Sequence, residues 1–393
     1  NSYNTAVGSA AGAAVTTGTY NTLIGGLAGD GMTTGATNTA VGASSLSGVV
    51  TGSNNVAVGY VSLEDVTSGH ENVAIGRSSG LQLTEGGENV IVGYQALLAD
   101  TKGHRSVAVG FNALATQDFT SVTNTHNTAI GYNAGGGVTT GVQNTIVGAA
   151  AADAMTSGQN NVFVGYAAGG AGVITGSSNI GIGVASLAPL TSGANNIAIG
   201  EDAGPGITSG SNNMCLGHDA GRAGSPGGGL TTSSDSIRVG DENVTNCHIQ
   251  VDWTVASDQR DKTDFTALDL GLDFVKALAP VTYKWDKRSK YGDKTADDYD
   301  LNAQTPDGTH KEDWLDIGFK AQEVQTLEEA AGYTTAAKKN LTVSTSGDGK
   351  QMGLQYSKFV PILVKAIQEL SAKNDALENA NTLLANRITA LEG

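Results

Sequence analysis

The chain has 393 residues and is rich in glycine (55 copies), with only 15% charged and 5% aromatic side chains. Its formal net charge is −16, and both residues 1–224 (12 acidic, 4 basic) and residues 225–393 (26 acidic, 18 basic) are net acidic, which argues against nucleic acid as a partner. No apolar run approaches the ~18–20 residues that cross a bilayer, so membrane insertion is not expected. The two cysteines, Cys215 and Cys247, are too few for a disulfide framework.

A pentapeptide, Asn-x-x-(Val/Ile/Leu)-Gly, recurs thirteen times within residues 1–224. Ten of the twelve intervals between copies are 17 residues; the exceptions are 21, where QDFTSVTNTH enlarges a turn near Phe119, and 18. A period this regular predicts a solenoid. The copies begin at Asn4, Asn21, Asn38, Asn55, Asn72, Asn89, Ser106, Asn127, Asn144, Asn161, Asn179, Asn196 and Asn213.

Each 17-residue repeat is too short for a pair of helices, and its Val and Ile alternate with small residues. This pattern predicts a short strand, a turn, a second short extended segment and a glycine-containing return turn. Thirteen coils stacked at the ~4.7–4.9 Å spacing of strands would make a rod of roughly 60 Å. We expect the asparagines to form a hydrogen-bonded ladder, and the repeat glycine, such as Gly8, to occupy a corner with no room for a Cβ.

A single coil of this composition has a thin interior of Ala, Val and Ile, and buries little apolar area at ~25 cal/mol per Å². We therefore expect three copies of the chain to pack side by side as a homotrimer. Residues 1–224 resemble the Asn-x-Ala-Ile-Gly-rich head of trimeric adhesins, a left-handed parallel β-roll. The 17-residue period is longer than the usual coil of that family, so the handedness stays open.

The rod shows no pattern typical of a catalytic or metal site. Its acidic pairs are scattered over the turns of different coils, and we expect no cluster of Arg or aromatic side chains that would form a sugar platform. The six histidines lack ligand spacing, so neither a metal nor a cofactor is expected. The acidic pairs are Glu64 and Asp65, Glu85 and Glu88, and Glu201 and Asp202.

Residues 225–256 are predicted to be a β linker, in which SPGGGL (residues 225–230) makes a turn and residues 237–255 form two strands. Residues 257–393 contain larger apolar side chains and predict a small α+β domain. Its expected elements are a helix that stops at Pro280, a strand at 281–285, a long loop at 293–313 and an extended segment that becomes a helix over 317–330.

The segment SDQRDK, residues 257–262, matches a signature SDxRxK, and further motifs follow it in order. Through these motifs residues 232–393 resemble the endosialidase-type C-terminal intramolecular chaperone of phage tail fibres and tailspikes. In that family the domain helps three chains to assemble and then cuts itself off with a serine–lysine dyad. The further matching residues are Leu278, Ala279, Pro280, Tyr283, Trp285, Gly318, Phe319, Lys320, Ala321, Gln322, Glu323, Val324 and Tyr356, with Lys320 standing where the family more often has an apolar residue.

The resemblance implies Ser257 as nucleophile, Lys262 as general base and Ala256–Ser257 as the bond that is cut. Such a lysine needs a pKa lowered from ~10.4 by burial or a nearby cation. Arg260 is a candidate for that cation, whereas Asp258 acts in the opposite direction. Gln322 and Glu323 are expected to have supporting roles, as capping groups or as groups that orient neighbouring residues.

The C-terminal segment, about residues 356–392, shows apolar residues with heptad spacing, which predicts a coiled coil. A buried Asn at the companion heptad column favours two strands in parallel coiled coils, but the rod and the chaperone resemblance favour three. The first column holds Leu363, Leu370, Leu377, Leu384 and Leu391, and the companion column holds Ile367, Asn374, Asn381 and Ile388.

These features together predict a trimeric phage tail fibre shaft that binds a host glycan or protein receptor and carries a self-releasing chaperone. The repeat is already running at Asn1, so we expect a longer protein whose preceding part joins other tail proteins in the virion tail. Two alternatives stay open, a bacterial surface adhesin and a glycan-depolymerising tailspike. A membrane-anchor barrel would distinguish the adhesin, whereas this sequence closes on a polar helix.

Overall fold

The computed structural model describes residues 2–250, 254–294, 299–336, 339, 341–346 and 348–392. The chain divides into two compact units, Asn1–Asn243 and Val244–Gly393. None of the described helices combines the length and the apolar character needed to cross a membrane.

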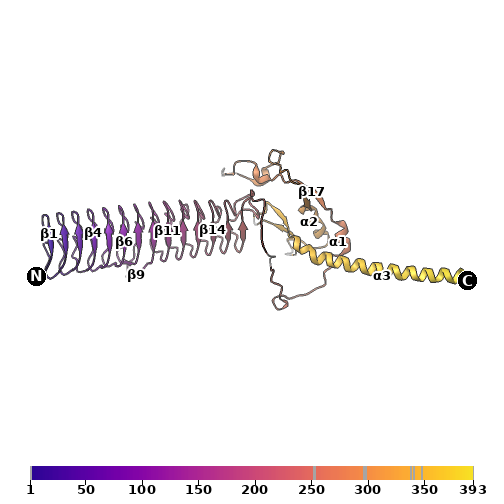
Figure 1. Cartoon of the computed structure of the whole chain (residues 1–393), viewed down its shortest axis with the longest axis horizontal. Coiled ribbons are helices and arrows are strands. Elements are labelled where there is room, and N and C mark those ends of the chain that lie inside the picture. The colour runs from indigo at the N-terminus through magenta and orange to yellow at the C-terminus, as the bar shows by residue number, and fades with distance from the viewer. Residues whose placement is uncertain are drawn as a thin grey trace. The chain divides into compact units, whose positions relative to one another are not determined.

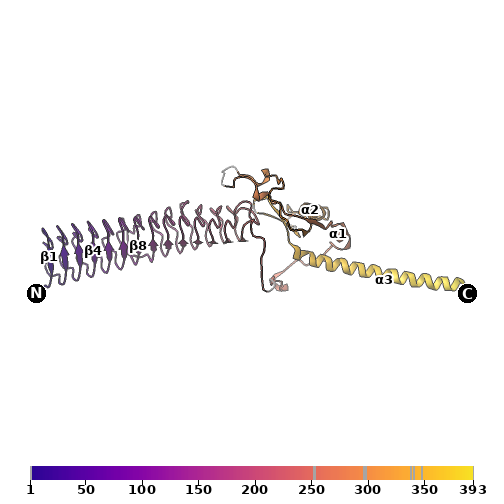
Figure 2. The same ribbon diagram turned by 45° about the horizontal axis from the view of Figure 1, so that its top comes forward.

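The first unit is a parallel β-solenoid in which fourteen short strands form one continuous sheet (Figure 1 and Figure 2). Each strand pairs with the equivalent residues of the next coil, for example Thr5 with Thr22. The predicted solenoid is confirmed. The strands are β1 Thr5–Val7, β2 Thr22–Ile24, β3 Thr39–Val41, β4 Val56–Val58, β5 Val73–Ile75, β6 Val90–Val92, β8 Val107–Val109, β10 Thr128–Ile130, β11 Thr145–Val147, β12 Val162–Val164, β13 Ile180–Ile182, β14 Ile197–Ile199, β15 Met214–Leu216 and β16 Ile237–Val239.

The solenoid continues beyond residue 224, where the linker was expected to begin. Ser236 and the four residues after it (SIRVG) form a fourteenth copy of the pentapeptide, 23 residues after Asn213, and β16 pairs in register with β15. The enlarged turn between them packs Leu230 into the core. The expected second strand is absent from residues 240–250 and 254–255, and residues 251–253 lie outside the described residues.

The middle residue of each strand points into the coil, and the flanking two point outward. Leu23, Ile91 and Phe163 are 0–1% exposed, whereas Val7 is 59% exposed. The expected second extended segment of each coil is not a regular strand, because single hydrogen bonds such as Thr33 N–H to Val50 O (3.1 Å) connect it. Among the described residues only β7 (Gly103–His104) and β9 (Thr123–Asn124) pair there.

The predicted asparagine ladder is present and buried. The backbone N–H of Asn38 donates to Oδ1 of Asn21 at 2.9 Å, and Nδ2 of Asn38 donates to Gly52 O at 3.0 Å, across the interior of the coil. In most coils Nδ2 also donates to the preceding asparagine, as Asn55 does to Asn38 at 3.1 Å. Each carboxamide therefore joins two coils and closes its own.

The repeat glycines occupy the predicted tight corners. Gly25 has φ +138°, and a Cβ there would lie 2.5 Å from Gly42 O. Cys215 is a buried free thiol, and burial raises its pKa to about 11.

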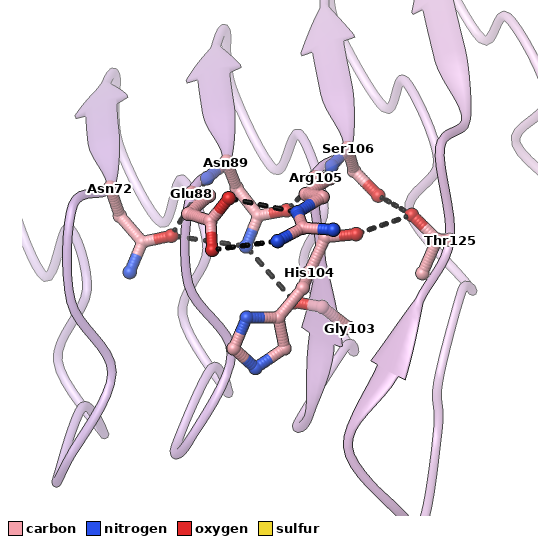
Figure 3. A network of polar contacts seen from close by, with 8 residues as sticks. All are labelled: Asn72, Glu88, Asn89, Gly103, His104, Arg105, Ser106 and Thr125. Atoms are coloured by element: carbon pink, nitrogen blue, oxygen red, sulfur yellow. Dashed lines mark hydrogen bonds and ion pairs between the residues drawn. The ribbon is translucent and has the colours of Figure 1, made fainter.

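The enlarged turn near Phe119 restores the hydrogen-bonded ladder where Ser106 replaces asparagine. Ser106 N–H still donates to Oδ1 of Asn89 at 2.7 Å, and its hydroxyl contacts Thr125 at 2.6 Å (Figure 3) and accepts from Gln117 Nε2 at 3.0 Å. Gln117 supplies the missing amide, since its Nε2 donates to Asp100 at 2.6 Å and its Oε1 accepts from Asn127 Nδ2 at 2.8 Å.

The second unit is a small α+β domain, as predicted. Two antiparallel pairs, β17–β18 and β19–β20, accompany three helices around a core of Leu270, Phe274, Val324, Val343, Phe359 and Ile362. The expected loop at 293–313 contains only one helical turn among its described residues. The elements are η1 Gln259–Asp261, α1 Leu272–Ala277, β17 Val281–Tyr283, η2 Arg288–Lys290, η3 Leu301–Ala303, β18 Asp316–Gly318, α2 Ala321–Ala330, β19 Val343–Thr345, β20 Met352–Leu354, η4 Tyr356–Lys358 and α3 Phe359–Glu392.

The long helix α3 packs on its own domain only at its start. Phe359, Ile362 and Ala366 are buried, whereas Leu370 and Leu377 are 55% and 62% exposed. The heptad stripe is therefore uncovered along most of the helix.

Candidate functional site

Ser257 and Lys262 lie next to each other in the second unit. The helical turn η1 folds the chain between them, and Nζ of Lys262 donates to Oγ of Ser257 at 2.6 Å. Both side chains and Ala256 are exposed in the single chain. The geometry places a basic nitrogen within proton-transfer distance of the serine hydroxyl.

Asp258 and Arg260 form the turn that brings this pair together. Oδ1 of Asp258 caps η1 by accepting from Arg260 N–H at 2.9 Å, and the Arg260 guanidinium lies 2.6 Å from Oδ2 of Asp258. The hydrogen bond from Arg260 holds the pKa of Asp258 below its usual value. Arg260 is thus paired with Asp258 and supports the turn, and its expected effect on Lys262 stays a prediction.

Gln322 and Glu323 lie in the first turn of α2, and their recorded contacts are local. Glu323 pairs with Lys320 at 2.7 Å, and the carbonyl of Gln322 accepts the hydroxyl of Thr326 at 3.0 Å. Lys320 is the exposed N-cap residue of α2, so a lysine is accommodated there without burial.

Other motif residues meet in the fold. Oη of Tyr356 lies where a Cβ of Gly318 would be, 2.4 Å from that position, and accepts the Phe319 N–H at 3.3 Å. Phe319 stacks on Tyr356 and Phe359, and the three ring centroids lie 5.4–6.3 Å apart. A Cβ at Gly318 would displace the Tyr356 hydroxyl from this aromatic cluster, which joins β18 to the start of α3.

The solenoid carries a row of stacked side chains that the sequence analysis did not expect. Tyr94, Phe111 and Tyr132 stack at 5.0 and 5.2 Å between ring centroids, and Arg77 lies between Tyr60 and Tyr94. The expectation of no Arg or aromatic cluster on the rod is therefore wrong. All five residues directly follow a repeat glycine, and this shared position was the available signal.

One group of carboxylates approaches a histidine near the end of the solenoid. His218 Nδ1 lies 3.5 Å from Asp219 and 3.4 Å from Asp241, while Arg222 pairs with Asp219 at 2.6 Å. The three possible ligand atoms lie within 4.8 Å of one another. Arg222 already supplies a positive charge to Asp219, so these residues form a local ion-pair group.

The fold and the site define a class of protein, a parallel β-solenoid that carries a C-terminal α+β unit with a serine–lysine pair at its start. Residues 257–333 match a family model, Peptidase_S74, described as chaperone of endosialidase. The match begins at Ser257 and confirms the resemblance found in the motifs. A search of curated proteins finds no match for the chain.

Proposed function

We propose that the chain is a trimeric phage tail fibre shaft that binds a host receptor. Its C-terminal domain drives trimerisation and folding, and autoproteolysis between Ala256 and Ser257 then releases that domain. The observation that carries the proposal is the 2.6 Å contact between Lys262 Nζ and Ser257 Oγ at the residue where the chaperone match begins.

The proposed cleavage uses the hydroxyl on the C-terminal side of the bond. Lys262 removes the proton from Ser257 Oγ, the oxygen attacks the Ala256 carbonyl carbon, and the C–N bond breaks as the proton passes to the departing amine of Ser257. The product is an ester between Ala256 and Ser257. Water hydrolyses this ester, which leaves a carboxylate on Ala256 and a free amine and hydroxyl on Ser257.

The outward face of the sheet supports a trimer. In a parallel in-register trimer, residues near the three-fold axis meet their own copies, so charged side chains there would repel one another. The first and third positions of all fourteen strands are Thr, Val, Ile, Met or Leu. Exposed members such as Val7 (59%) and Ile199 (42%) would be covered by neighbouring chains.

The uncovered stripe on α3 supports the same assembly. Its leucines would pack between copies as a coiled coil. Parallel solenoid strands pair with residues distant in sequence and fold slowly, so a helix that trimerises first would align the three chains. Cleavage after assembly removes this aligning element and makes unfolding effectively irreversible.

A test of the nucleophile compares Ser257→Cys with Ser257→Ala in the full chain. The cysteine keeps a nucleophilic atom, so cleavage persists, whereas alanine abolishes it. Equal cleavage of the two variants on a denaturing gel would exclude Ser257 as the nucleophile.

A further inference from the structure

The residue after each repeat glycine forms a line along the solenoid, which we call the post-glycine column. Its members lie in equivalent positions of successive coils, because the strands that precede them pair in register. The column consists of Ser9, Gly26, Ala43, Tyr60, Arg77, Tyr94, Phe111, Tyr132, Ala149, Tyr166, Val184, Glu201, His218 and Asp241.

Within this column, Arg77 fills a slot between two tyrosines that are two coils apart. The guanidinium carbon lies 5.7 Å from the ring centroid of Tyr60 and 5.6 Å from that of Tyr94. Both ring faces carry negative potential and attract the cation. A slot between two tyrosines of this column can therefore hold a guanidinium group.

A second pair of tyrosines with this spacing lies further along the column, with only a small side chain between them. Tyr132 and Tyr166 are two coils apart, and Ala149 occupies the position equivalent to Arg77. Two coil repeats span ~9.5 Å, and Ala149 contributes only a methyl group. Tyr132 and Tyr166 are 60% and 63% exposed, whereas Phe111, covered on both faces, is 40% exposed.

The net negative charge of the solenoid unit favours a cation in the slot between Tyr132 and Tyr166. The unit Asn1–Asn243 holds 15 acidic and 5 basic side chains. Lys102, Arg105 and Arg222 are paired with carboxylates of their own unit. Arg238 donates to Gly227 O at 3.1 Å and Arg77 fills its own slot, so a cation for this slot has to come from outside the unit.

We propose that the slot of Tyr132, Ala149 and Tyr166 binds a guanidinium group, the side chain of an arginine presented by a partner protein. A guanidinium is planar and stacks on two ring faces at once, which an ammonium does not. The column also contains Arg77 and Glu201, whose copies would repel one another near a three-fold axis, so it lies away from the proposed self-contact face. The site does not depend on cleavage; its position relative to the self-contact face and the identification of the partner with a host receptor rest on the proposed function.

Saturation-transfer NMR on the purified full-length protein tests this, with N-acetyl-arginine methylamide as probe and the uncharged citrulline analogue as control. We expect a signal from the arginine probe roughly two- to fivefold above that of citrulline. Tyr166→Leu should remove the difference, and Tyr20→Leu, in another column, should keep it. Equal signals from the two probes, or an unchanged difference in Tyr166→Leu, would overturn the proposal.

Two further variants test the slot itself. Arg77→Ala opens a second slot and should increase the arginine signal, whereas Ala149→Arg should fill the first and decrease it. Ala149→Arg should also melt at a higher temperature than Ala43→Arg, which has an aromatic neighbour on one side only. The opposite order of melting temperatures, or a changed oligomeric mass of Tyr166→Leu, would show that the slot does not hold a guanidinium from a partner.

Discussion

Oδ1 of Asn38 accepts the backbone N–H of Asn55 at 2.9 Å, and Asn55 in turn accepts the N–H of Asn72 at 3.1 Å. These buried bonds run along the inside of the solenoid and connect each coil to the next. They add buried carboxamide hydrogen bonds to the apolar core that fills the coils.

Replacing Asn55 with alanine should destabilise the shaft. Gly69 O loses the donor that lies at 2.9 Å, and Asn72 N–H loses its acceptor, at about 1–3 kcal/mol for each buried group left without a partner. The melting temperature by circular dichroism should fall clearly, while Asn124→Ala, at an exposed position, should change it little. Similar melting of the two variants would contradict the role of the ladder.

Two adjacent glycines should respond very differently to alanine. At Gly25 the new Cβ would lie 2.5 Å from Gly42 O at a φ of +138°, whereas at Gly26 nothing lies within 4 Å. We expect Gly25→Ala to lower stability by about 2–4 kcal/mol, from overpacking and backbone strain, and Gly26→Ala to be near neutral. Thermal melts of both variants check this, and comparable losses would refute the corner geometry.

The buried Asp100 should make stability depend on pH. Burial raises its pKa in the folded chain above the unfolded value, so its contribution is complete below the unfolded pKa of ~3.9 and is lost as pH rises through the folded pKa. The melting temperature of wild type relative to Asp100→Asn should therefore decrease from pH 4 towards neutrality. Asp118→Asn, at an exposed position, serves as control. A melting-temperature difference between wild type and Asp100→Asn that increases with pH would contradict this prediction.

Leucines on α3 should be needed for assembly. Leu377 is 62% exposed in the single chain, and an aspartate there would place three charges in the proposed seam. Leu377→Asp should reduce the yield of trimer severalfold, whereas Asn379→Asp, on the outer side of the heptad, should not. Sedimentation of the freshly expressed full chain measures this, and normal trimer yield in Leu377→Asp would argue against the seam.

The sequence predicted the solenoid well because its determinants are local and repeated. The asparagine and the corner glycine recur at fixed spacing, and each requires the same contact in every coil. The copy at Ser236 was missed because serine replaces asparagine and the preceding turn is enlarged. Gln117 could not be recognised as the substitute for the amide missing at Ser106, since only the folded turn brings it there.

The serine–lysine pair was predicted for a different reason, namely the resemblance of SDQRDK to a family signature, and the turn η1 places the two side chains in contact. The pairing of Arg260 with Asp258 could not be predicted from the sequence. It depends on the backbone of η1, which brings the guanidinium next to the Asp258 carboxylate. The stacked row from Tyr60 to Tyr132 was overlooked because its members are 17 or more residues apart and look isolated along the chain.

The central claim is that the chain cuts itself at one bond, and the mass of the denatured full-length protein after expression tests it most directly. Wild type should yield two fragments that end at Ala256 and begin at Ser257, while Ser257→Ala and Lys262→Ala stay intact and Lys276→Ala cleaves like wild type. An intact wild-type chain, or cleavage at Ala256–Ser257 that persists in Ser257→Ala, would contradict the account.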